Sequence, residues 1–291
     1  MSFWKILRVL VTDSCNYRCV YCHNEGQKVK RNKCLGYNEF VQIFNKVNET
    51  SIHEIRFSGG EPLTNPEILK MIEYVRHNSD MEIGVATNGS LISDNIAKQF
   101  MKFNVLVTVH LPTVDKDLYQ TITGQSIEFM IDGVKLLVDN AVNYSFNHVL
   151  YFPTTKYFNQ IIDSNIVKGR RLKILPFLDS NFHNKSASII PEIVTKVDSI
   201  ALKKEVFLKE GIVRWDLPFG TSIKLLQAPC YNKDLIMCKN YAEVRLLPDL
   251  RLKKCIFDTS NYKIDLEKNE TTLILKKMWK DFNSCCGERE V

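Results

Sequence analysis

Residues 7–26 read LRVLVTDSCNYRCVYCHNEG, an apolar run that leads directly into three closely spaced cysteines. The run over Ile6–Thr12 is aliphatic and β-branched and predicts a buried strand. Cys15, Cys19 and Cys22 follow with the spacing CxxxCxxC, in the loop after that strand. Three thiolates in one loop can hold three irons of a cubane cluster and leave the fourth iron open to an outside ligand. A zinc site is the alternative, because His23 follows Cys22 and would complete a Cys3His set.

The composition indicates an ordinary globular protein. The chain has 291 residues, of which 45% are hydrophobic and 25% charged, which excludes disorder and fibrous repeats. No apolar run approaches the roughly 20 residues that cross a bilayer, and the first residues lack the pattern of a secretory signal. We therefore expect a cytoplasmic protein with no membrane partner. In a reducing compartment, nine cysteines favour metal binding or catalysis over disulfides.

The net charge of +6 is mild, and the Lys and Arg residues are scattered along the chain. This pattern suits an anionic small substrate and makes a nucleic-acid partner unlikely.

Short apolar runs alternate with helical patterns over the first two-thirds of the chain. Strands are expected at Ile6–Thr12, Glu54–Ser58, Glu82–Thr87, Val105–Leu111, Ser145–Phe152 and Leu172–Phe177. Helices are expected at Tyr37–Asn48, Pro66–His77, Ser93–Phe103, Ile127–Asn140, Lys156–Val167 and Pro191–Lys209. Several strands read as continuous apolar runs, which is typical of parallel strands buried on both faces.

Six βα units favour a partly or fully closed parallel barrel, or a doubly wound sheet. In either fold, ligands bind at the carboxyl ends of the strands. From Trp215 onward, turn residues and five of the nine cysteines indicate a second, smaller unit. The predicted division is therefore a core over residues 1–212 and a cysteine-rich unit over residues 213–291.

Four motifs fall at the ends of the first four predicted strands, and together they resemble the radical S-adenosylmethionine (SAM) enzymes. These motifs are the cysteine triplet with Tyr21 before its last member, Gly59-Gly60-Glu61-Pro62, Thr87-Asn88-Gly89 and Val109-His110-Leu111-Pro112. The resemblance implies a partial (β/α)6 barrel and a [4Fe-4S] cluster held by Cys15, Cys19 and Cys22. SAM would chelate the open iron, and its reductive cleavage would yield a 5′-deoxyadenosyl radical that abstracts hydrogen from the substrate. The resemblance also implies an electron donor such as flavodoxin or ferredoxin.

By position in the family, Gly59, Gly60, Glu61 and Pro62 would meet the SAM amino group through backbone and carboxylate. Tyr21 would lie near the adenine, and Asn88 and His110 would be further cofactor contacts. For these last three residues the alternatives are loop packing, an ordinary turn and a packed histidine, respectively.

Longer segments resemble one branch of this family, the molybdenum-cofactor biosynthesis protein A group of GTP 3′,8-cyclases. They are residues 7–26, IRFSGGEPL at 55–63, VTVHLPTVDKDLYQTITG at 107–124 and VRLLPDLRLKKCIF at 244–257. Cys238 and Cys255 match the second and third of the three cysteines that hold a second cluster in that group, with a longer gap between them, and the first cysteine is missing. Cys230, Cys285 and Cys286 are the remaining candidates for an auxiliary iron–sulfur cluster, whereas Cys34 is expected to be a thiol without a role in a site.

The cyclase arginines of the motif CNRLR are mostly absent, and only Arg245 remains. Because guanidinium groups suit phosphate better than neutral side chains do, we expect a substrate other than GTP, or GTP that is bound differently. The leading hypothesis is a radical SAM enzyme that cyclises, cross-links or rearranges a small molecule or a peptide. GTP 3′,8-cyclase is the first alternative, and a non-catalytic iron–sulfur or zinc protein is the second.

Overall fold

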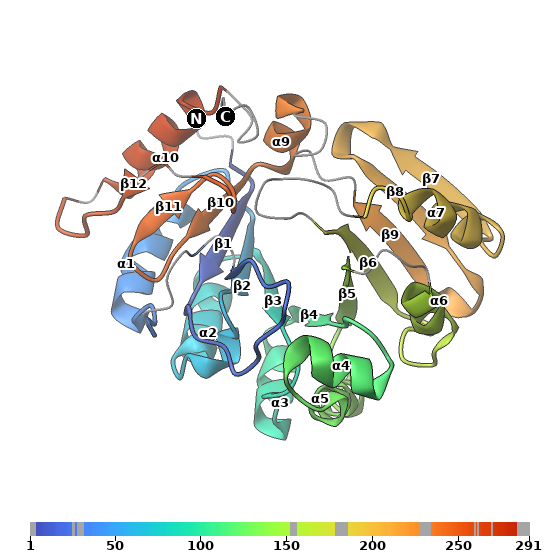
Figure 1. The fold of residues 1–291 in the computed structure, drawn as a ribbon. Helices are drawn as coiled ribbons and strands as arrows, with labels where there is room; N and C mark the ends of the chain where they lie inside the picture. Colours follow the sequence, from blue (N-terminus) through green and yellow to red (C-terminus); the bar gives the residue numbers. More distant parts are fainter. Residues whose placement is uncertain are drawn as a thin grey trace.

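The computed structural model describes residues 4–24, 27, 32–151, 156–177, 186–226, 234–258, 260, 262–268 and 270–283. These residues form one twelve-stranded sheet in the order β12-β11-β10-β1-β2-β3-β4-β5-β6-β9-β8-β7. The middle of the sheet is parallel, from β10 through β9. Figure 1 shows these strands as an open arc with helices on its convex side. The fold is therefore an α/β fold with a partial barrel, as predicted.

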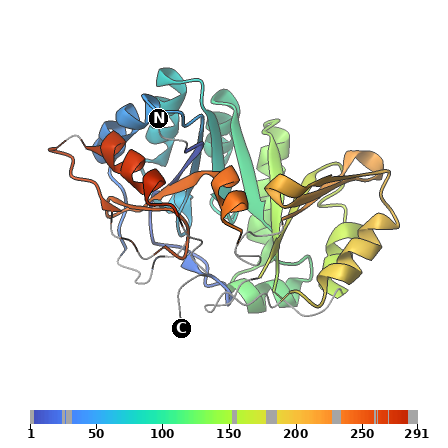
Figure 2. The same ribbon diagram turned by 90° about the horizontal axis from the view of Figure 1, so that it is seen from above.

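The strands of the parallel part are β10 (Glu243–Leu246), β1 (Ile6–Leu10), β2 (Glu54–Ser58), β3 (Glu82–Thr87), β4 (Val105–His110), β5 (Tyr144–Leu150), β6 (Arg171–Pro176) and β9 (Ser222–Leu226). Antiparallel strands extend both ends of the arc: β11 (Arg251–Lys253) and β12 (Tyr262–Lys263) beyond β10, and β8 (Ile212–Asp216) and β7 (Lys203–Phe207) beyond β9. Figure 2, seen from above, shows these two extensions on opposite sides of the molecule.

The helices that follow the strands are α1 (Tyr37–Asn48), α2 (Ile68–Asn78), α3 (Asp94–Lys102), α4 (Lys116–Thr123), α5 (Ile127–Asp139), α6 (Lys156–Asp163) and α7 (Ile190–Asp198). Later in the chain come α9 (Leu235–Tyr241) and α10 (Thr271–Lys280), and short 3-10 turns occur at η2 (Pro62–Thr64), η3 (Leu208–Glu210) and η4 (Pro218–Gly220). No helix in the described part of the chain is long and apolar enough to cross a membrane.

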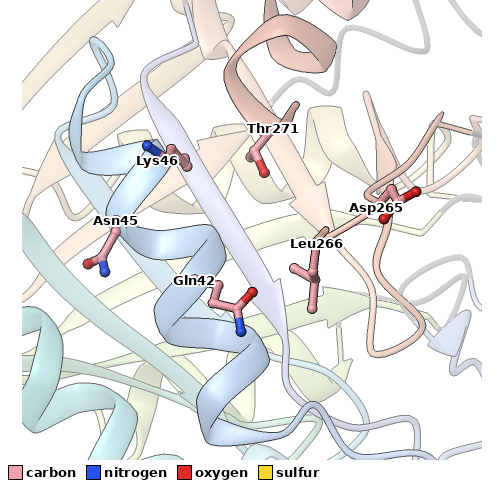
Figure 3. Close-up of a pocket in the computed structure, with 6 residues that line it drawn as sticks. All are labelled: Gln42, Asn45, Lys46, Asp265, Leu266 and Thr271. Atoms are coloured by element: carbon pink, nitrogen blue, oxygen red, sulfur yellow. The ribbon is translucent and has the colours of Figure 1, made fainter. Parts of the chain in front are cut away.

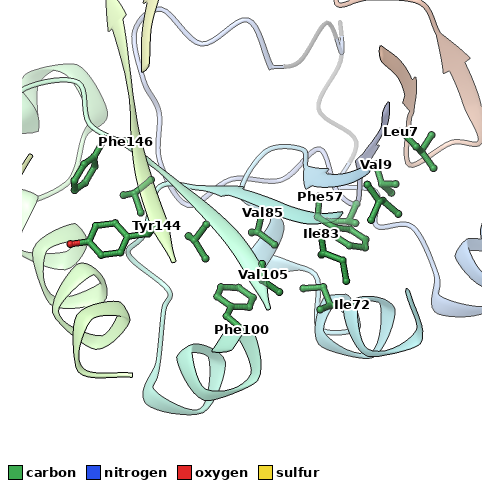
Figure 4. Packing of buried hydrophobic residues seen from close by; sticks show 14 of the residues in the cluster. Leu7, Val9, Phe57, Ile72, Ile83, Val85, Phe100, Val105, Tyr144 and Phe146 are labelled. Carbon is green, nitrogen blue, oxygen red and sulfur yellow. The ribbon is translucent and has the colours of Figure 1, made fainter. Parts of the chain in front are cut away.

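The hydrophobic core lies between the arc of strands and its outer helices. Figure 4 shows part of it, in which Val9, Phe57 and Ile83 from three strands face Ile72 and Phe100 from two helices. Along β4 and β5 the side chains alternate between buried and half-buried, because only the outer face is covered by helices. The prediction of strands buried on both faces is therefore wrong: the inner, concave face of the arc, called the lumen below, carries polar and charged residues.

Most predicted strands and helices are confirmed within about two residues, which is within the usual uncertainty of element ends. Ser93 caps α3, since its hydroxyl accepts a hydrogen bond from the Ile96 amide. The predicted helix over Pro191–Lys209 is wrong beyond Asp198, because Lys203–Phe207 forms strand β7. Pairing with β8 across a turn that ends at Gly211 (φ 60°) outweighs the helical periodicity of that segment.

Helix α4 was not expected from the sequence. The Asp115 carboxylate caps its first turn through the Leu118 amide, and Gly124 ends it in the left-handed conformation (φ 74°). These two residues were the signal that sequence reasoning missed.

The expected boundary between residues 212 and 213 falls inside one continuous sheet. It lies at the start of β8, and β10 from the later part pairs with β1 along Ile6–Val9. The division into two units stays a prediction, but both parts contribute strands to the same arc.

Candidate active site

The three cysteines of the triplet lie in the loop after β1. All three are present as thiols; Cys15 and Cys19 are half-buried and Cys22 is exposed. Backbone amides point at two of the sulfurs: Tyr17 N lies 3.4 Å from Cys15 Sγ, and Asn24 N lies 3.3 Å from Cys22 Sγ. Hydrogen bonds of this kind stabilise thiolates that ligate iron–sulfur clusters. Among the described residues, no three His, Cys, Asp or Glu side chains are grouped so as to hold a metal ion.

The cysteine loop is fixed to the end of α4. The Arg18 amide donates to Thr123 O at 3.0 Å, and the Val20 amide donates to Ile122 O at 3.0 Å. The buried Tyr17 ring packs edge-on against Tyr119, with ring centroids 6.4 Å apart. Residues 107–124, which the sequence analysis identified only by their resemblance to a family segment, therefore support the cysteine loop through α4.

Gly59 and Gly60 allow the end of β2 to pack directly against the cysteine loop. The Gly60 amide donates to Thr12 O at 2.9 Å, and the Glu61 amide donates to Ser14 O at 2.8 Å. A Cβ atom would lie 2.3 Å from Thr12 O at Gly59 and 2.0 Å from Ser14 O at Gly60, so neither position has room for a side chain. The close approach that requires glycine is thus between two loops of the protein.

The Glu61 carboxylate is buried and joins the end of β2 to the end of β3. It accepts hydrogen bonds from Thr87 Oγ1 and Asn88 N, both at 2.7 Å, and from Leu63 N at 3.1 Å. Burial raises the pKa of Glu61 to about 7, although these three hydrogen bonds act in the opposite direction. The oxygens that were expected to meet SAM are therefore engaged with the next strand, and Pro62 follows in η2.

Asn88 is also buried and connects β3 to the cysteine loop. Its Nδ2 donates to Asn16 Oδ1 at 2.9 Å, and its Oδ1 accepts from Ser90 N at 2.9 Å and Ser90 Oγ at 2.7 Å. Asn16 directly follows Cys15, so this network links the third strand to the first cysteine.

Tyr21 and His110 form a hydrogen-bonded pair, with 2.6 Å between Tyr21 Oη and His110 Nε2. Burial lowers the pKa of His110 to about 4, and the nearby His148 lowers it further, so the ring is neutral at physiological pH. A neutral ring with its hydrogen on Nδ1 accepts the Tyr21 hydroxyl hydrogen at Nε2. The rings of Tyr151 and Phe177, at the ends of β5 and β6, continue the aromatic cluster, with Tyr21 and Tyr151 centroids 4.9 Å apart.

Cys238 and Cys255 lie in a separate region, in α9 and just after β11. The lysines that follow Cys238 and precede Cys255 in the sequence both lie near the ring of Phe282. Lys239 Nζ is 5.8 Å and Lys254 Nζ is 5.7 Å from the ring centroid. Phe282 stacks in turn on Trp4, which anchors the end of α10 to the start of β1. The other three candidate cysteines, Cys230, Cys285 and Cys286, lie outside the described residues.

The sequence reasoning missed a charged cluster on the inner face of the arc. Arg8, Arg56 and Arg245 are neighbours on β1, β2 and β10, and all three guanidinium groups contact the Glu243 carboxylate. Lys173 on β6 faces the same cluster. Charged residues at alternating positions of short predicted strands were the signal for this lumen, because such positions face away from the core.

A surface pocket between α1 and the segment that leads into α10 is lined by Gln42, Asn45, Lys46, Asp265, Leu266 and Thr271 (Figure 3). No predicted site residue lines it.

A family model for the radical SAM superfamily matches residues 9–163, which include the cysteine loop and the ends of the first five strands. The chain belongs to the radical SAM superfamily. It is therefore an enzyme, and its family binds a [4Fe-4S] cluster and SAM. The three thiols and the amides that point at two of them supply the donor chemistry of such a cluster, although among the described residues they do not form a group that could hold one metal ion. The alternative of a non-catalytic iron–sulfur or zinc protein finds no support in this membership.

Curated relatives carry the name probable GTP 3′,8-cyclase. The relative from Methanococcus aeolicus is 29% identical over 266 residues, which is 88% of this chain and 87% of the relative. The relative from Saccharolobus solfataricus is 23% identical over 261 residues, 88% of this chain and 83% of the relative. The predicted resemblance to this branch of radical SAM enzymes is thereby confirmed.

Solved structures with the same fold include one with a bound precursor peptide and one with bound AdoMet. Streptococcus suis SuiB bound to the precursor peptide SuiA superposes with a TM-score of 0.70 at 14% identity over 96% of this chain. The chain spans 65% of the length of that SuiB chain. The enzyme anSMEcpe with bound AdoMet gives a TM-score of 0.65 at 16% identity, over 94% of this chain and 83% of the other. At these identities the likeness shows the fold alone.

Proposed function

We propose that this radical SAM enzyme abstracts hydrogen from a small molecule or a peptide and so cyclises, cross-links or rearranges it. The observation that carries the proposal is the joint between the first three strand ends, where the cysteine loop, Gly59–Glu61 and Asn88 are locked together by hydrogen bonds. When bound, the cluster and SAM supply the reductive cleavage that generates the 5′-deoxyadenosyl radical. The protein supplies the position of both groups at the mouth of the lumen.

In this proposal Cys15, Cys19 and Cys22 hold the cluster. The SAM amino group meets the backbone of residues 59–62, since the Glu61 side chain is occupied by Thr87, Asn88 and Leu63. Asn88, His110 and Tyr21 surround the remaining parts of SAM, with the Tyr21 ring held in place by its hydrogen bond to His110. A flavodoxin or a ferredoxin delivers the electron.

An auxiliary iron–sulfur cluster near Cys238 and Cys255 forms the second part of the proposal. The two lysines next to these cysteines converge on Phe282. Cys285 is three residues further along the chain, and three residues span at most about 11 Å. Either Cys285 or Cys286, with Cys230 in reserve, therefore completes a ligand set with Cys238 and Cys255.

Iron and sulfide quantitation with Mössbauer spectra tests both clusters at once. The variant in which Cys15, Cys19 and Cys22 are all changed to Ala should keep about half of the cluster iron of the reconstituted wild type. Complete loss of iron would leave one cluster only. A second variant, Cys238→Ala with Cys255→Ala, should lose the other half and retain SAM cleavage.

GTP 3′,8-cyclase activity is the second candidate, favoured by the names of the curated relatives and by Arg8, Arg56 and Arg245 in the lumen. Against it stands Glu243, two residues before Arg245, where the resemblance to CNRLR would have an arginine. Anaerobic incubation of the wild type with GTP, SAM and dithionite, followed by mass spectrometry, decides the matter. Cyclised nucleotide would establish the cyclase; 5′-deoxyadenosine without cyclised nucleotide would exclude it.

A further inference from the structure

The lumen of the barrel contains one carboxylate that is bound by three arginines. Glu243 Oε1 accepts hydrogen bonds from Arg8 Nε at 2.9 Å and from Arg245 Nη2 at 2.7 Å. Glu243 Oε2 accepts from Arg8 Nη2 at 2.9 Å and from Arg56 Nη1 at 3.3 Å. Four donors therefore converge on one side chain, which leaves the carboxylate little capacity to bind anything else.

These charges are poorly accessible to water. The side chains of Arg8, Arg245 and Glu243 are 14%, 13% and 15% exposed. Burial alone would raise the pKa of Glu243, but Arg8, Arg245 and Arg56 outweigh it and hold the pKa far below its ordinary value. Glu243 is thus a permanent anion inside the lumen at any physiological pH.

The lumen nevertheless keeps an excess of positive charge. Arg56 has a second carboxylate partner, Glu54, on its own strand. Lys173 on β6 adds a fourth cation, so that Arg8, Arg56, Arg245 and Lys173 face the two carboxylates Glu243 and Glu54. Among the described residues, no carboxylate lies within ion-pair distance of Lys173, and burial together with Arg56 and Arg8 lowers the pKa of Lys173 to about 8. Lys173 therefore faces Arg8 and Arg56, which are already paired with Glu243, and has no carboxylate of its own among the described residues.

Uncharged polar atoms at the same lumen also lack partners. Asn147 Oδ1, on the strand position next to Lys173, is buried without a hydrogen bond, and so are Ser58 Oγ and Tyr241 Oη. Arg56 and Glu243 both act on Tyr241, which places this hydroxyl near the arginine cluster. Buried polar atoms without partners are uncommon in folded proteins, and a polar ligand would satisfy them.

We propose that Glu243 is a specificity-determining residue: it supplies the negative charge that the three arginines would otherwise take from a substrate. The site then accepts a carboxylate-bearing substrate, whose charge matches Lys173 and the residual positive field, and rejects a nucleoside triphosphate. A triphosphate would have to displace Glu243 from its four hydrogen bonds and leave that carboxylate buried beside phosphate oxygens of the same charge. The inference rests on the proposed function, because it takes the lumen as the substrate site.

Anion binding to the reconstituted enzyme with SAM, without reductant, tests this inference by calorimetry. The probes are inorganic triphosphate, GTP, glutarate as a free acid, and a short blocked peptide with one glutamate. The wild type should bind a carboxylate probe and show no saturable binding of triphosphate or GTP. Binding of glutarate would identify the substrate as a free carboxylic acid, whereas binding of the peptide alone would identify it as a carboxylate carried by a peptide.

The decisive variant is Glu243→Gln, which removes the charge and keeps the size of the side chain. Its affinity for triphosphate should rise by about 100-fold or more, because three guanidinium groups become available to the anion. Glu54→Gln is the matched control, since it removes the same charge from β2, two strands away from β10, but concerns one arginine only. It should change triphosphate affinity by less than about threefold.

Glu243→Gln leaves three partly buried arginines without their anion, and failure of this variant to fold by itself is one outcome of the test. In that case triphosphate should restore its folding, seen by circular dichroism, and should not stabilise the wild type. Lys173→Met, in an otherwise native lumen, should weaken carboxylate binding at least tenfold. The inference is overturned if the wild type binds triphosphate as tightly as Glu243→Gln does, if Glu54→Gln gives an equal gain, or if Lys173→Met leaves carboxylate binding unchanged.

Formation of 5′-deoxyadenosine by the same wild-type preparation is measured separately with dithionite. Its absence would refute the proposed function. Normal 5′-deoxyadenosine formation together with any of the three contrary binding results would refute the role of Glu243 alone.

Discussion

The two cysteine regions of this enzyme are assembled in opposite ways. Cys15, Cys19 and Cys22 come from eight consecutive residues, in a loop that is hydrogen-bonded to the ends of β2, β3 and α4. Cys238 and Cys255 come from α9 and from the segment after β11, and the neighbouring Lys239 and Lys254 both lie near the Phe282 ring at the end of α10. The first region therefore depends on local sequence and strand ends, whereas the second depends on the docking of the last helix.

Loss of one thiol in the first region has the largest expected effect. Cys19→Ala removes one of the three cluster ligands that we propose, so formation of 5′-deoxyadenosine should fall below detection. Cys34→Ala is the control, because Cys34 is an exposed thiol outside the triplet. The measurement is 5′-deoxyadenosine by liquid chromatography after reduction with dithionite. Equal loss in both variants would show that general thiol content, not the triplet, supports the reaction.

The glycine contact that positions the first region comes next. Gly60→Ala places a Cβ atom 2.0 Å from Ser14 O, so the two loops must separate. The rate of SAM cleavage should drop about 100-fold, and the free energy of unfolding should fall by about 2–3 kcal/mol. Gly84→Ala is matched in chemistry, but its Cβ would meet nothing closer than 3.5 Å, so it should keep near wild-type rate and stability. Identical behaviour of the two variants contradicts the loop contact.

The joint between β2 and β3 should give stability a pH dependence. Burial raises the pKa of Glu61 from 4.5 to about 7, so the folded protein holds this proton more tightly than the unfolded chain does. The corresponding stabilisation is complete below about pH 4.5 and is lost as the pH rises through about 7. Between those limits the free energy of unfolding should fall by up to about 3 kcal/mol relative to Glu61→Gln.

Urea unfolding of the apoprotein at pH 4.5 and pH 7.5 measures this difference. Glu49→Gln, at an exposed position, should leave the pH dependence of the wild type unchanged. A constant difference between wild type and Glu61→Gln at both pH values would contradict the buried, proton-retaining carboxyl group.

The Tyr21–His110 pair should have a smaller effect. Tyr21→Phe removes the hydroxyl that lies 2.6 Å from His110 Nε2, and SAM cleavage should slow about tenfold, as expected for one buried hydrogen bond. His110→Phe should behave similarly, while His110→Gln, which keeps an acceptor, should recover most of the rate. If His110→Gln is as slow as His110→Phe, the hydrogen bond is not what positions Tyr21.

Loss of the Phe282 ring should affect only the second cysteine region, that of Cys238 and Cys255. Phe282→Ala removes a ring that stacks on Trp4 at 5.8 Å between centroids, and should destabilise the protein by about 3 kcal/mol. Iron attributable to the proposed auxiliary cluster should decrease, while 5′-deoxyadenosine formation per remaining SAM cluster stays within about threefold of wild type. A large loss of SAM cleavage would show that the two regions are coupled and that the contrast between them fails.

The same contrast explains what the sequence could predict. The first region was predictable because its ligands, glycines and strand ends lie in short consecutive motifs, and α1 was placed at Tyr37–Asn48 exactly where the structure has it. The role of Glu61 was not, since a GGEP motif does not reveal that its carboxylate bonds to Thr87 and Asn88 of the next strand.

The inner charges were missed for a different reason. Arg8, Arg56 and Glu243 are separated by up to 235 residues, and only the register of three strands brings them together. Strand β7 was read as helix because its periodicity is ambiguous over a few residues, and its partner β8 decides its conformation. Long-range pairing thus determines the lumen and the second region, whereas local motifs determine the first.

Cleavage of SAM by the reconstituted wild type tests the central claim most directly. Under anaerobic conditions with dithionite, the protein should form 5′-deoxyadenosine and methionine in equal amounts, with strict dependence on SAM and reductant. Absence of 5′-deoxyadenosine from protein that shows a spectroscopically intact, reducible [4Fe-4S] cluster would contradict it.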